Sequence, residues 1–192
     1  MKKTILTTLL LTLSILAVPA QAADYDIDTK GAHAFIQFKI NHLGFSWLVG
    51  RFNKFDGHFS YDEKKANASS VEVNIDPASI DSNHAERDKH LRSKDFLDVE
   101  KFPTAKFVST GYKSKGKNKG VLKGKLTLHG VTKEISINVK HIGAGNDPWG
   151  NYRAGFEGST TLTLADFGIN YNLGPASRTV EMFLSVEGIR RK

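Results

Sequence analysis

The sequence predicts an all-β protein built as an eight-stranded antiparallel barrel. Apolar and polar residues alternate along most of the chain, and this alternation sends the apolar side chains to one face of each strand. Short turns that contain glycine separate the alternating runs, and no repeated helical pattern lies between them. A sheet with one apolar face must pair with a second sheet or close on itself, and closure also removes its edges. A two-sheet sandwich is the competing fold, because it also buries alternate residues.

The first alternating run spans residues 33–41 and places three apolar side chains on one face: Ile36, Phe38 and Ile40. The next run, 47–61, is apolar or small first at even and then at odd positions: Leu48, Gly50 and Phe52, followed by Phe55, Gly57 and Phe59. A change of parity inside one strand is typical of a β-bulge, and we expect that bulge near Asn53.

Six further runs each have one apolar or small face: Val71, Val73 and Ile75; Phe107 and Ser109; Leu122, Gly124, Leu126 and Leu128; Ile135, Ile137 and Val139; Phe156, Leu162 and Leu164; Val180, Met182, Leu184 and Val186. Residues 129–132 form the turn of the clearest hairpin. The opposite face of several strands carries lysine, which lipid would not accept. We therefore expect no stable membrane insertion.

Residues 80–103 interrupt the alternation. Asn83 and Glu86 stand at the spacing of a capping box and Pro103 supplies a stop, so we expect two or three helical turns. Only four apolar residues are available to dock this segment: Ala85, Leu91, Phe96 and Leu97. The segment should therefore lie across the barrel or its mouth, and both a lid and a simple plug over the core fit this pattern.

The first 22 residues have the form of a signal peptide. Lys2 and Lys3 precede an apolar stretch, residues 5–18, that is too short to span a bilayer, and Ala20 and Ala22 form a small-x-small cleavage site. We expect cleavage after Ala22 and a periplasmic destination; a retained N-terminal anchor is the alternative. Residues 23–192 have the length of a single domain. They contain no cysteine for a disulfide or a lipid anchor.

The charge of the mature chain is mildly basic. Loss of Lys2 and Lys3 lowers the basic residues from 27 to 25 against 20 acidic ones, which leaves a formal charge of +5. Much of the excess lies in the lysines of residues 113–119, a pattern typical of a solvated hairpin tip. Aromatic residues and lysines fall on opposite faces of the strands, so we expect no nucleic-acid partner.

The predicted interior is poor in groups that carry chemistry. Its strand faces hold almost no ionisable residue apart from His141, and the chain has no cysteine and no G-x-S-x-G motif. General acid–base catalysis needs titratable groups that converge in a pocket. We therefore expect a protein that is not an enzyme, with no catalytic residue and no cofactor.

A metal-dependent or enzymatic role of residues 84–95 is one alternative. Two pairs four residues apart have a spacing that suits a divalent metal: His84 with Asp88, and Glu86 with His90. Solvated pairing along a helix explains the same residues, and no third ligand is identifiable, so we expect no metal site. A stress-related interaction protein with a filled barrel is the other alternative, since barrels host many functions.

An eight-stranded barrel is either filled by side chains or holds one small ligand. Four glycines fall at inward positions beside bulky neighbours: Gly50, Gly57, Gly124 and Gly158. They would leave space along the axis or mark the bends that closure requires. A cavity with so few titratable groups suits a long, thin, apolar molecule.

Several segments of the chain resemble the YceI-like family of bacterial periplasmic proteins: AHAFIQFKINHLGFSWLVGRFNKFDGHF, NHAERDKHLRSKDFLDVEKFPTAKF, GKLTLHGVTKEI, RAGFEG and ADFGI. Their order matches the family across essentially the whole mature chain. The resemblance implies a lipocalin-like barrel that binds isoprenoid chains or similar amphiphiles, such as polyprenyl or quinone-type lipids, and often forms a homodimer. It supplies no agreed catalytic residues. A fatty-acyl amphiphile is a further candidate ligand.

The sequence therefore predicts a periplasmic binding or carrier protein for a long apolar lipid. We expect these residues to bind the ligand: Ile36, Phe38, Ile40, Leu48, Phe52, Phe55, Phe59, Phe107, Leu126, Leu128, Ile137, Phe156, Met182 and Leu184. Four polar residues either fix local structure or meet a head group, and the structural role is the simpler explanation: His33, His42, Arg92 and Asp95. Phe183, alone among polar neighbours, is a candidate contact for a homodimer.

Overall fold

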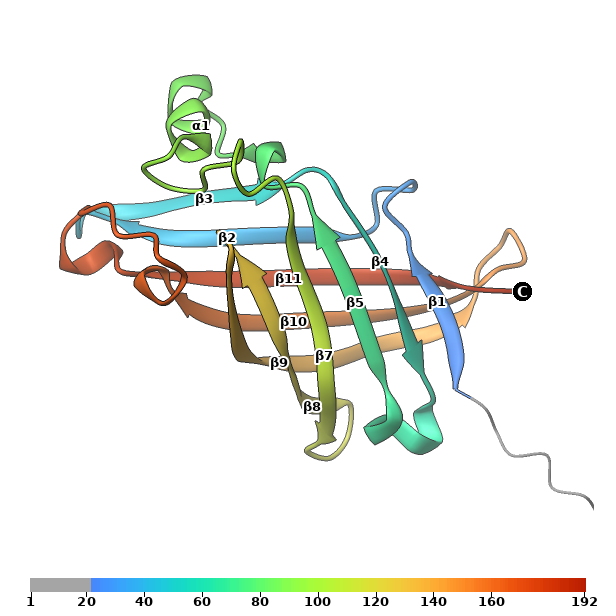
Figure 1. Ribbon diagram of the computed structural model, residues 1–192. Coiled ribbons are helices and arrows are strands. Elements are labelled where there is room, and N and C mark those ends of the chain that lie inside the picture. Colours follow the sequence, from blue (N-terminus) through green and yellow to red (C-terminus); the bar gives the residue numbers. More distant parts are fainter. Residues whose placement is uncertain (1–21) are drawn as a thin grey trace, which may run out of the picture.

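Hydrogen bonds between strands join eleven strands of residues 22–192 into one antiparallel sheet, in the computed structural model that describes these residues (Figure 1). The predicted leader, residues 1–22, lies outside the described residues except for Ala22. The strands are β1 (Ala23–Ile27), β2 (Phe35–His42), β3 (Ser46–Phe52), β4 (Phe55–Tyr61), β5 (Ser70–Ile75), β6 (Ile80–Asp81), β7 (Ala105–Ser114), β8 (Lys119–Leu128), β9 (Val131–Asn146), β10 (Tyr152–Thr163) and β11 (Thr179–Arg190).

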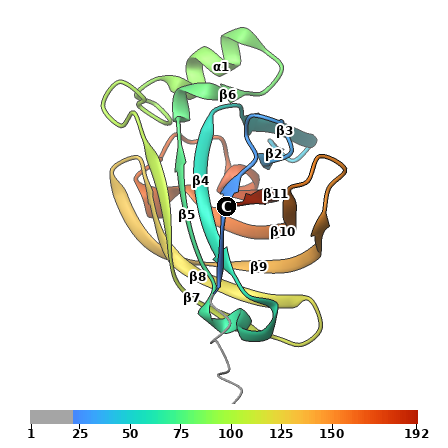
Figure 2. The same ribbon diagram turned by 90° about the vertical axis from the view of Figure 1, so that its right-hand side faces the viewer.

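Eight of these strands close into a barrel, as the sequence predicts. Their order is β1, β4, β5, β7, β8, β9, β10 and β11, and β11 pairs back onto β1. The closing register places Tyr25 opposite Arg190 and Ile27 opposite Gly188. Figure 2 shows the strands arranged in a ring that forms the wall of the barrel. Closure leaves no free edge between β1 and β11, which removes a site of unwanted strand pairing.

The last strand, β11, is long enough to pair with two strands along one edge. Its C-terminal end pairs with β1, whereas residues 180–185 pair with β2. Strands β2, β3 and β6 therefore extend the wall beyond the closed ring. The wall is extended at the end of the barrel where β10 leads into β11, on the left of Figure 1.

Two details of the predicted strand set are wrong. The expected single strand with a bulge near Asn53 is two strands, because β3 pairs with β2 and β6 whereas β4 pairs with β1 and β5. Between them, the N–H groups of Asn53 and Lys54 donate to the carbonyl and hydroxyl of Ser79. The change of parity therefore marks the point where the chain leaves one part of the wall for another. Strand β1 is absent from the prediction, although its five residues (ADYDI) alternate between apolar and polar side chains.

The interrupting segment does contain a helix, α1 (Ala85–Arg92), of about two turns. Its N-cap is His84, whose Nδ1 accepts from the N–H of Arg87 at 3.2 Å, and not Asn83, which has a φ of 64°. Short 3₁₀ turns complete the elements: η1 (Glu63–Ala68), η2 (Pro77–Ser79), η3 (Leu164–Phe167) and η4 (Pro175–Ser177). Figure 1 shows α1 over β3. Phe96 and Leu97 are buried in the core, whereas Ala85 is exposed.

Aromatic rings fill the space above two of the inward glycines. A Cβ on Gly50 would lie 2.4 Å from Cζ of Phe38, and a Cβ on Gly124 would lie 2.3 Å from Cζ of Phe107. Each ring therefore lies flat across the neighbouring strand, where any side chain larger than hydrogen would displace it. These two glycines make room for aromatic rings and do not by themselves leave open space in the lumen.

The outer face of the barrel carries both charged and apolar side chains. The lysines of residues 113–119 are exposed at the β7–β8 turn, and Phe183 is 42% exposed on β11, as expected. Among residues 22–192, no helix combines the length and the apolar character needed to cross a bilayer.

Candidate functional site

The barrel encloses two apolar cavities. The larger has a volume of about 310 Å³ and lies where the α1 segment (residues 80–103) and the β10–β11 connection (residues 164–178) meet the barrel. The smaller has a volume of about 130 Å³ and lies towards η1. The lumen is therefore not filled by side chains, and an eight-stranded barrel of this kind has room for one small ligand.

All but one of the predicted ligand-binding residues line these cavities. The larger cavity is lined by Ile36, Phe38, Ile40, Leu48, Phe52, Leu126, Leu128 and Met182. The smaller cavity is lined by Phe59, Phe107, Ile137, Phe156 and Leu184. Phe55 lines neither cavity. It is half-buried and packs against a cluster of five buried residues: Tyr25, Ile27, Ala34, Phe59 and Ala154. The contact of these residues with a ligand stays a prediction.

The two cavities meet between successive inward-facing residues of the same strand. On β11, Met182 lines the larger cavity and Leu184 the smaller; on β7, Ala105 and Phe107 are divided in the same way. Phe107 is 6% exposed and its ring lies across Gly124 of β8. The two cavities are thus stacked along the barrel, and Phe107 is the largest of these boundary side chains.

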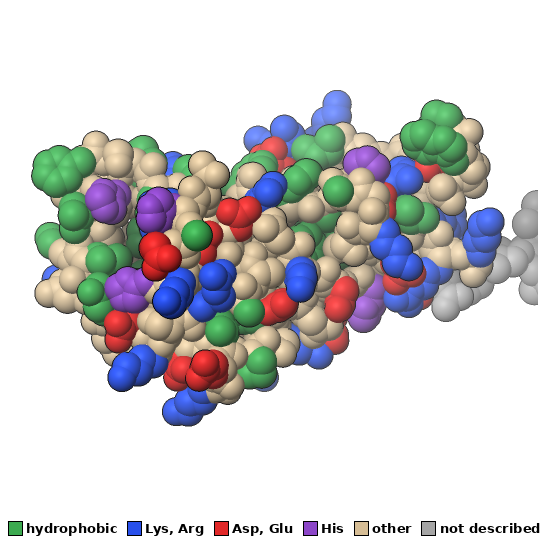
Figure 3. Space-filling model, turned by 90° about the horizontal axis from the view of Figure 1, so that it is seen from above, with side chains coloured by type: hydrophobic (Ala, Val, Ile, Leu, Met, Phe, Trp, Pro, Cys, Tyr) green, Lys and Arg blue, Asp and Glu red, His purple; other side chains and the backbone are tan. Residues whose placement is uncertain are grey.

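Five polar residues line the larger cavity, and we call the part of the wall that they form the mouth: Asn41, His42, Arg87, His90 and Ser177. His42 and His90 are exposed, so the cavity reaches the surface there. Figure 3 shows histidine and apolar side chains close together at its left-hand end, which is the end of β2 and β3. His42 thus lies at the mouth, and its contact with a head group stays a prediction.

Polar contacts hold the α1 segment in place over the barrel. The buried carboxylate of Asp88 accepts from the N–H of Ser82 at 2.8 Å and from its hydroxyl at 2.5 Å. Nη1 of Arg92 donates to the carbonyls of Ala78 and Ile80 at 3.5 and 3.4 Å. Arg92 therefore has the structural role that the sequence favours.

The helical histidines are each engaged separately, which speaks against the alternative of a metal site there. His84 caps α1, and Nε2 of His90 lies 3.1 Å from Oδ2 of Asp95. Asp88 is turned towards Ser82. Among residues 22–192, the group with metal-ligand geometry is instead Asp28, His33 and Glu187.

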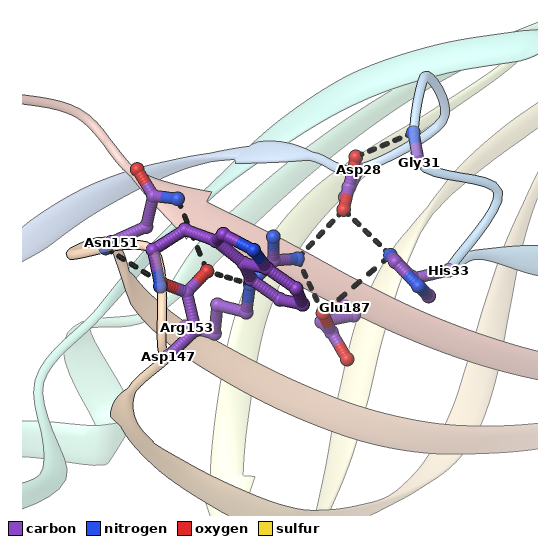
Figure 4. A network of polar contacts seen from close by, with 8 residues as sticks. Asp28, Gly31, His33, Asp147, Asn151, Arg153 and Glu187 are labelled. Carbon is purple, nitrogen blue, oxygen red and sulfur yellow. Dashed lines mark hydrogen bonds and ion pairs between the residues drawn. The ribbon is translucent and has the colours of Figure 1, made fainter.

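That group belongs to an ion network at the opposite end of the barrel (Figure 4). Nη1 of Arg153 donates to Oδ2 of Asp28 at 2.7 Å and to Oε1 of Glu187 at 2.6 Å, and its Nε donates to Oδ2 of Asp147 at 2.6 Å. Nδ1 of His33 lies 2.8 Å from Oδ2 of Asp28. The guanidinium of Arg153 already supplies the cation that these carboxylates need, so the geometry favours an ion network over a metal centre.

The network joins four separate segments. Arg153 is on β10, Glu187 is on β11, Asp147 is in the β9–β10 turn, and Asp28 and His33 lie in the β1–β2 connection. The N–H of Asp28 also donates to the carbonyl of Glu187 at 2.8 Å. The network therefore lies where β11 changes partner from β1 to β2, and it gives His33 its structural role.

Burial and hydrogen bonding oppose each other in setting the pKa values of this network. Burial alone would raise the pKa of Asp28, but hydrogen bonds from His33, Arg153 and the N–H of Gly31 lower it to about 2. The pKa of Asp147 is likewise lowered, since bonds from Arg153 and Asn151 outweigh its burial. Bonds to Asp147 and Asp28 raise the pKa of Arg153. All three groups are charged in the folded protein near neutral pH.

The stability of the protein is expected to fall in acid through Asp28. Its folded pKa of about 2 lies below the usual value of about 3.9, so its contribution is complete above about pH 4 and is lost as the pH falls towards 2. This contribution amounts to roughly 2 kcal/mol. Urea unfolding at several pH values checks it with Asp28→Asn, which should be less stable at neutral pH but lose less in acid. Equal losses in both proteins would refute the assignment.

Sequence reasoning missed the four charged residues of this network and, separately, Arg87 at the mouth. Asp28, Asp147, Arg153 and Glu187 lie far apart in the sequence and carry no motif, and Arg87 looks like any solvated helical arginine. An acidic residue next to a strand end is a weak signal of such a network, because strand ends of a barrel meet at one rim.

The fold and sequence are similar to those of known proteins. A UPF0312 protein of Pseudomonas paraeruginosa is 59% identical over 191 residues, which covers 100% of both chains. The crystal structure of Burkholderia cenocepacia BcnA is 22% identical with a TM-score of 0.76, over 84% of this chain and 99% of that chain. A polyisoprenoid binding domain from Saccharophagus degradans is 15% identical with a TM-score of 0.63, over 89% and 100%.

The YceI-like domain, as a family profile, matches residues 25–188. These residues run from within β1 to within β11 and include all or part of every strand of the closed barrel. The match confirms the resemblance that the sequence segments carry, and the chain belongs to the YceI-like family.

Proposed function

We propose that this protein binds one long apolar lipid in its barrel lumen, as a periplasmic binding or carrier protein without a chemical step. The observation that carries the proposal is the larger cavity, about 310 Å³ in volume and polar only at its mouth. An apolar cavity of about 150 Å³ holds one benzene molecule, and ligand pockets begin near 300 Å³. Burial of hydrocarbon there contributes about 0.8 kcal/mol per methylene group.

Two further observations support this proposal. The Saccharophagus degradans structure with the same fold is a polyisoprenoid binding domain, which makes prenyl lipids the first ligands to test. The cavity walls of the described residues hold few titratable groups, and His90 at the mouth is engaged with Asp95. Such a site suits binding better than acid–base catalysis. No observation favours the metal-dependent role, and the two cavities speak against a filled barrel.

Native mass spectrometry of protein purified without detergent, followed by organic extraction, tests the proposal directly. We expect a bound lipid, or uptake of prenyl or fatty-acyl lipids by the empty protein. Protein that is purified empty and takes up neither class of lipid would refute it.

Partial filling of the larger cavity should weaken this binding. Leu48 is half-buried on β3 and lines the cavity, so Leu48→Trp places a larger side chain in the ligand's space. We expect the affinity to fall about tenfold or more, since the added ring displaces roughly two methylene groups of ligand. The free energy of unfolding should stay within about 1 kcal/mol of the wild type. Displacement of a fluorescent lipid measures the affinity and urea unfolding measures the stability.

The neighbouring residue offers a matched control for that variant. Val49 follows on the same strand, points outwards and is 56% exposed. Val49→Trp increases the side-chain volume even more than Leu48→Trp does, but outside the barrel. This variant should bind lipid like the wild type. Unchanged binding by a folded Leu48→Trp protein would show that the ligand does not occupy this cavity.

We also propose that residues 1–22 are a leader removed on export and that residues 23–192 form a single domain. N-terminal sequencing of the exported protein tests the cleavage site, and a first residue other than Ala23 would contradict it. The homodimer also stays a prediction, with the exposed Phe183 as a candidate contact. A monomeric molar mass by light scattering would refute it.

A further inference from the structure

The mouth of the larger cavity contains one cationic side chain that faces it from α1. Arg87 is half-buried and lines the cavity. Its Nε donates to Oγ of Ser82 at 2.7 Å, and its Nη2 donates to the carbonyl of Ser82. These contacts orient the guanidinium on one side and leave Nη1 without a hydrogen-bond partner among the described residues.

No carboxylate forms an ion pair with Arg87 within residues 22–192. The nearby carboxylate of Asp88 accepts from the N–H and the hydroxyl of Ser82. The Ser82 hydroxyl therefore links Asp88 to Nε of Arg87 without a direct ion pair. By contrast, the guanidinium groups of Arg51, Arg153 and Arg191 each bind a carboxylate directly. A half-buried charge beside an apolar cavity is screened by solvent less than a surface charge and favours an anion.

The other polar groups at the mouth are mostly committed to local contacts. The carbonyl of Asn41 accepts from Oγ of Ser177 at 2.6 Å, and the amide oxygen of Asn41 accepts from the N–H of Gly44 at 2.6 Å. Nε2 of His90 faces Asp95, and its ring packs edge-on against Phe96 and Tyr171. The ring of His42 has no hydrogen bond within the described residues, but only Arg87 among the mouth residues is always charged and also has free donors.

We propose that Arg87 binds the anionic head group of an acidic amphiphile, a carboxylate or a phosphate, whose chain lies in the larger cavity. This inference rests on the proposed function and adds the chemical class and the orientation of the ligand. The head group lies at the α1 side of the mouth, and the chain points towards Phe107. Arginine donates to carboxylates and phosphates in charge-assisted hydrogen bonds, which are stronger than neutral ones.

The test compares three ligands with the same sixteen-carbon chain: palmitate, hexadecyl phosphate and hexadecanol. Affinities are measured by displacement of a fluorescent lipid at about pH 8, below the critical micelle concentration of each ligand. We expect the wild type to bind the two acids about tenfold or more tightly than the alcohol. This preference should shrink when salt is raised to about 1 M, where the Debye length is about 3 Å. The two acids differ only in the anion, so their ratio identifies the preferred head group.

Two substitutions separate head-group binding from a structural role. Arg87→Gln should remove most of the preference for acids while its affinity for hexadecanol stays within about twofold of the wild type. Arg87→Lys keeps the charge and should retain part of the preference. Arg92→Gln is the matched control, since Arg92 also binds backbone carbonyls beside α1 but does not line the cavity. It should keep the full preference.

Each outcome decides between the possibilities. A wild type that binds acids and alcohol equally, with no effect of salt, would overturn the inference and leave the proposed function standing. Equal losses for all three ligands in Arg87→Gln would also overturn it, because Arg87 would then only hold α1 in place. If the wild type binds none of the ligands and no prenyl lipid, the proposed function fails and takes the inference with it.

Discussion

Replacement of Arg153 by methionine is expected to lower the free energy of unfolding by about 3 kcal/mol. The guanidinium is 19% exposed and binds Asp28, Asp147 and Glu187, of which the first two are each 6% exposed. Its removal leaves two buried carboxylates without a cation, and an unpaired buried charge costs more than the intact pair contributes. Urea unfolding of the two proteins measures the difference.

Arg191 provides the control for this experiment. It binds Asp26 at 2.6 Å, but the side chains are 47% and 62% exposed. A surface pair of this kind contributes about 0 to 1 kcal/mol, so Arg191→Met should have a small effect. Similar losses in both variants would mean that the network at the rim does not hold the barrel closed.

Replacement of Phe107 by alanine is expected to change both stability and ligand choice. Phe107 is buried and its ring lies across Gly124, so its loss should cost about 3 to 5 kcal/mol. Because Phe107 stands at the boundary of the two cavities, the variant should join them into one longer lumen. Titration with lipids of increasing chain length should then show the best-bound length shifting to longer chains.

A phenylalanine on the outer face tests the specificity of that result. Phe183 is 42% exposed on β11, and Phe183→Ala should leave both the stability and the preferred chain length nearly unchanged. An unchanged length preference in a folded Phe107→Ala protein would show that Phe107 does not divide the lumen.

Much of the fold follows from local sequence pattern. Ile36, Phe38 and Ile40 on β2 alternate with polar residues, and the structure places all three in the wall of the larger cavity. Leu126 is another example, since it lies between Lys125 and Thr127 and points inwards. Alternation reports which face of a strand is apolar, and this property is carried by neighbours in the chain. The barrel itself follows because so many one-faced strands need a common interior.

The errors of the sequence prediction occurred where the structure depends on which strands pair and not on which face of a strand is apolar. The parity change near Asn53 indicates that a strand is interrupted, but it does not reveal that β3 and β4 pair with different neighbours. The same limit applies to Phe55, whose inward parity fits the apolar wall although it lines neither cavity. At the start of α1, His84 caps the helix instead of Asn83, because Asn83 adopts a positive φ as the chain turns.

The sequence by itself determined which side chains face inwards, the apolar character of the interior and the family of the protein. Tertiary structure alone decided which strands close the ring, how the lumen is divided into two cavities, and where charges meet. Asp28 and Arg153 are 125 residues apart in the chain, yet 2.7 Å separates their charged atoms. The reason is physical: alternation is set by the geometry of one strand, whereas an ion network or a cavity exists only where distant strands are brought together by closure of the barrel.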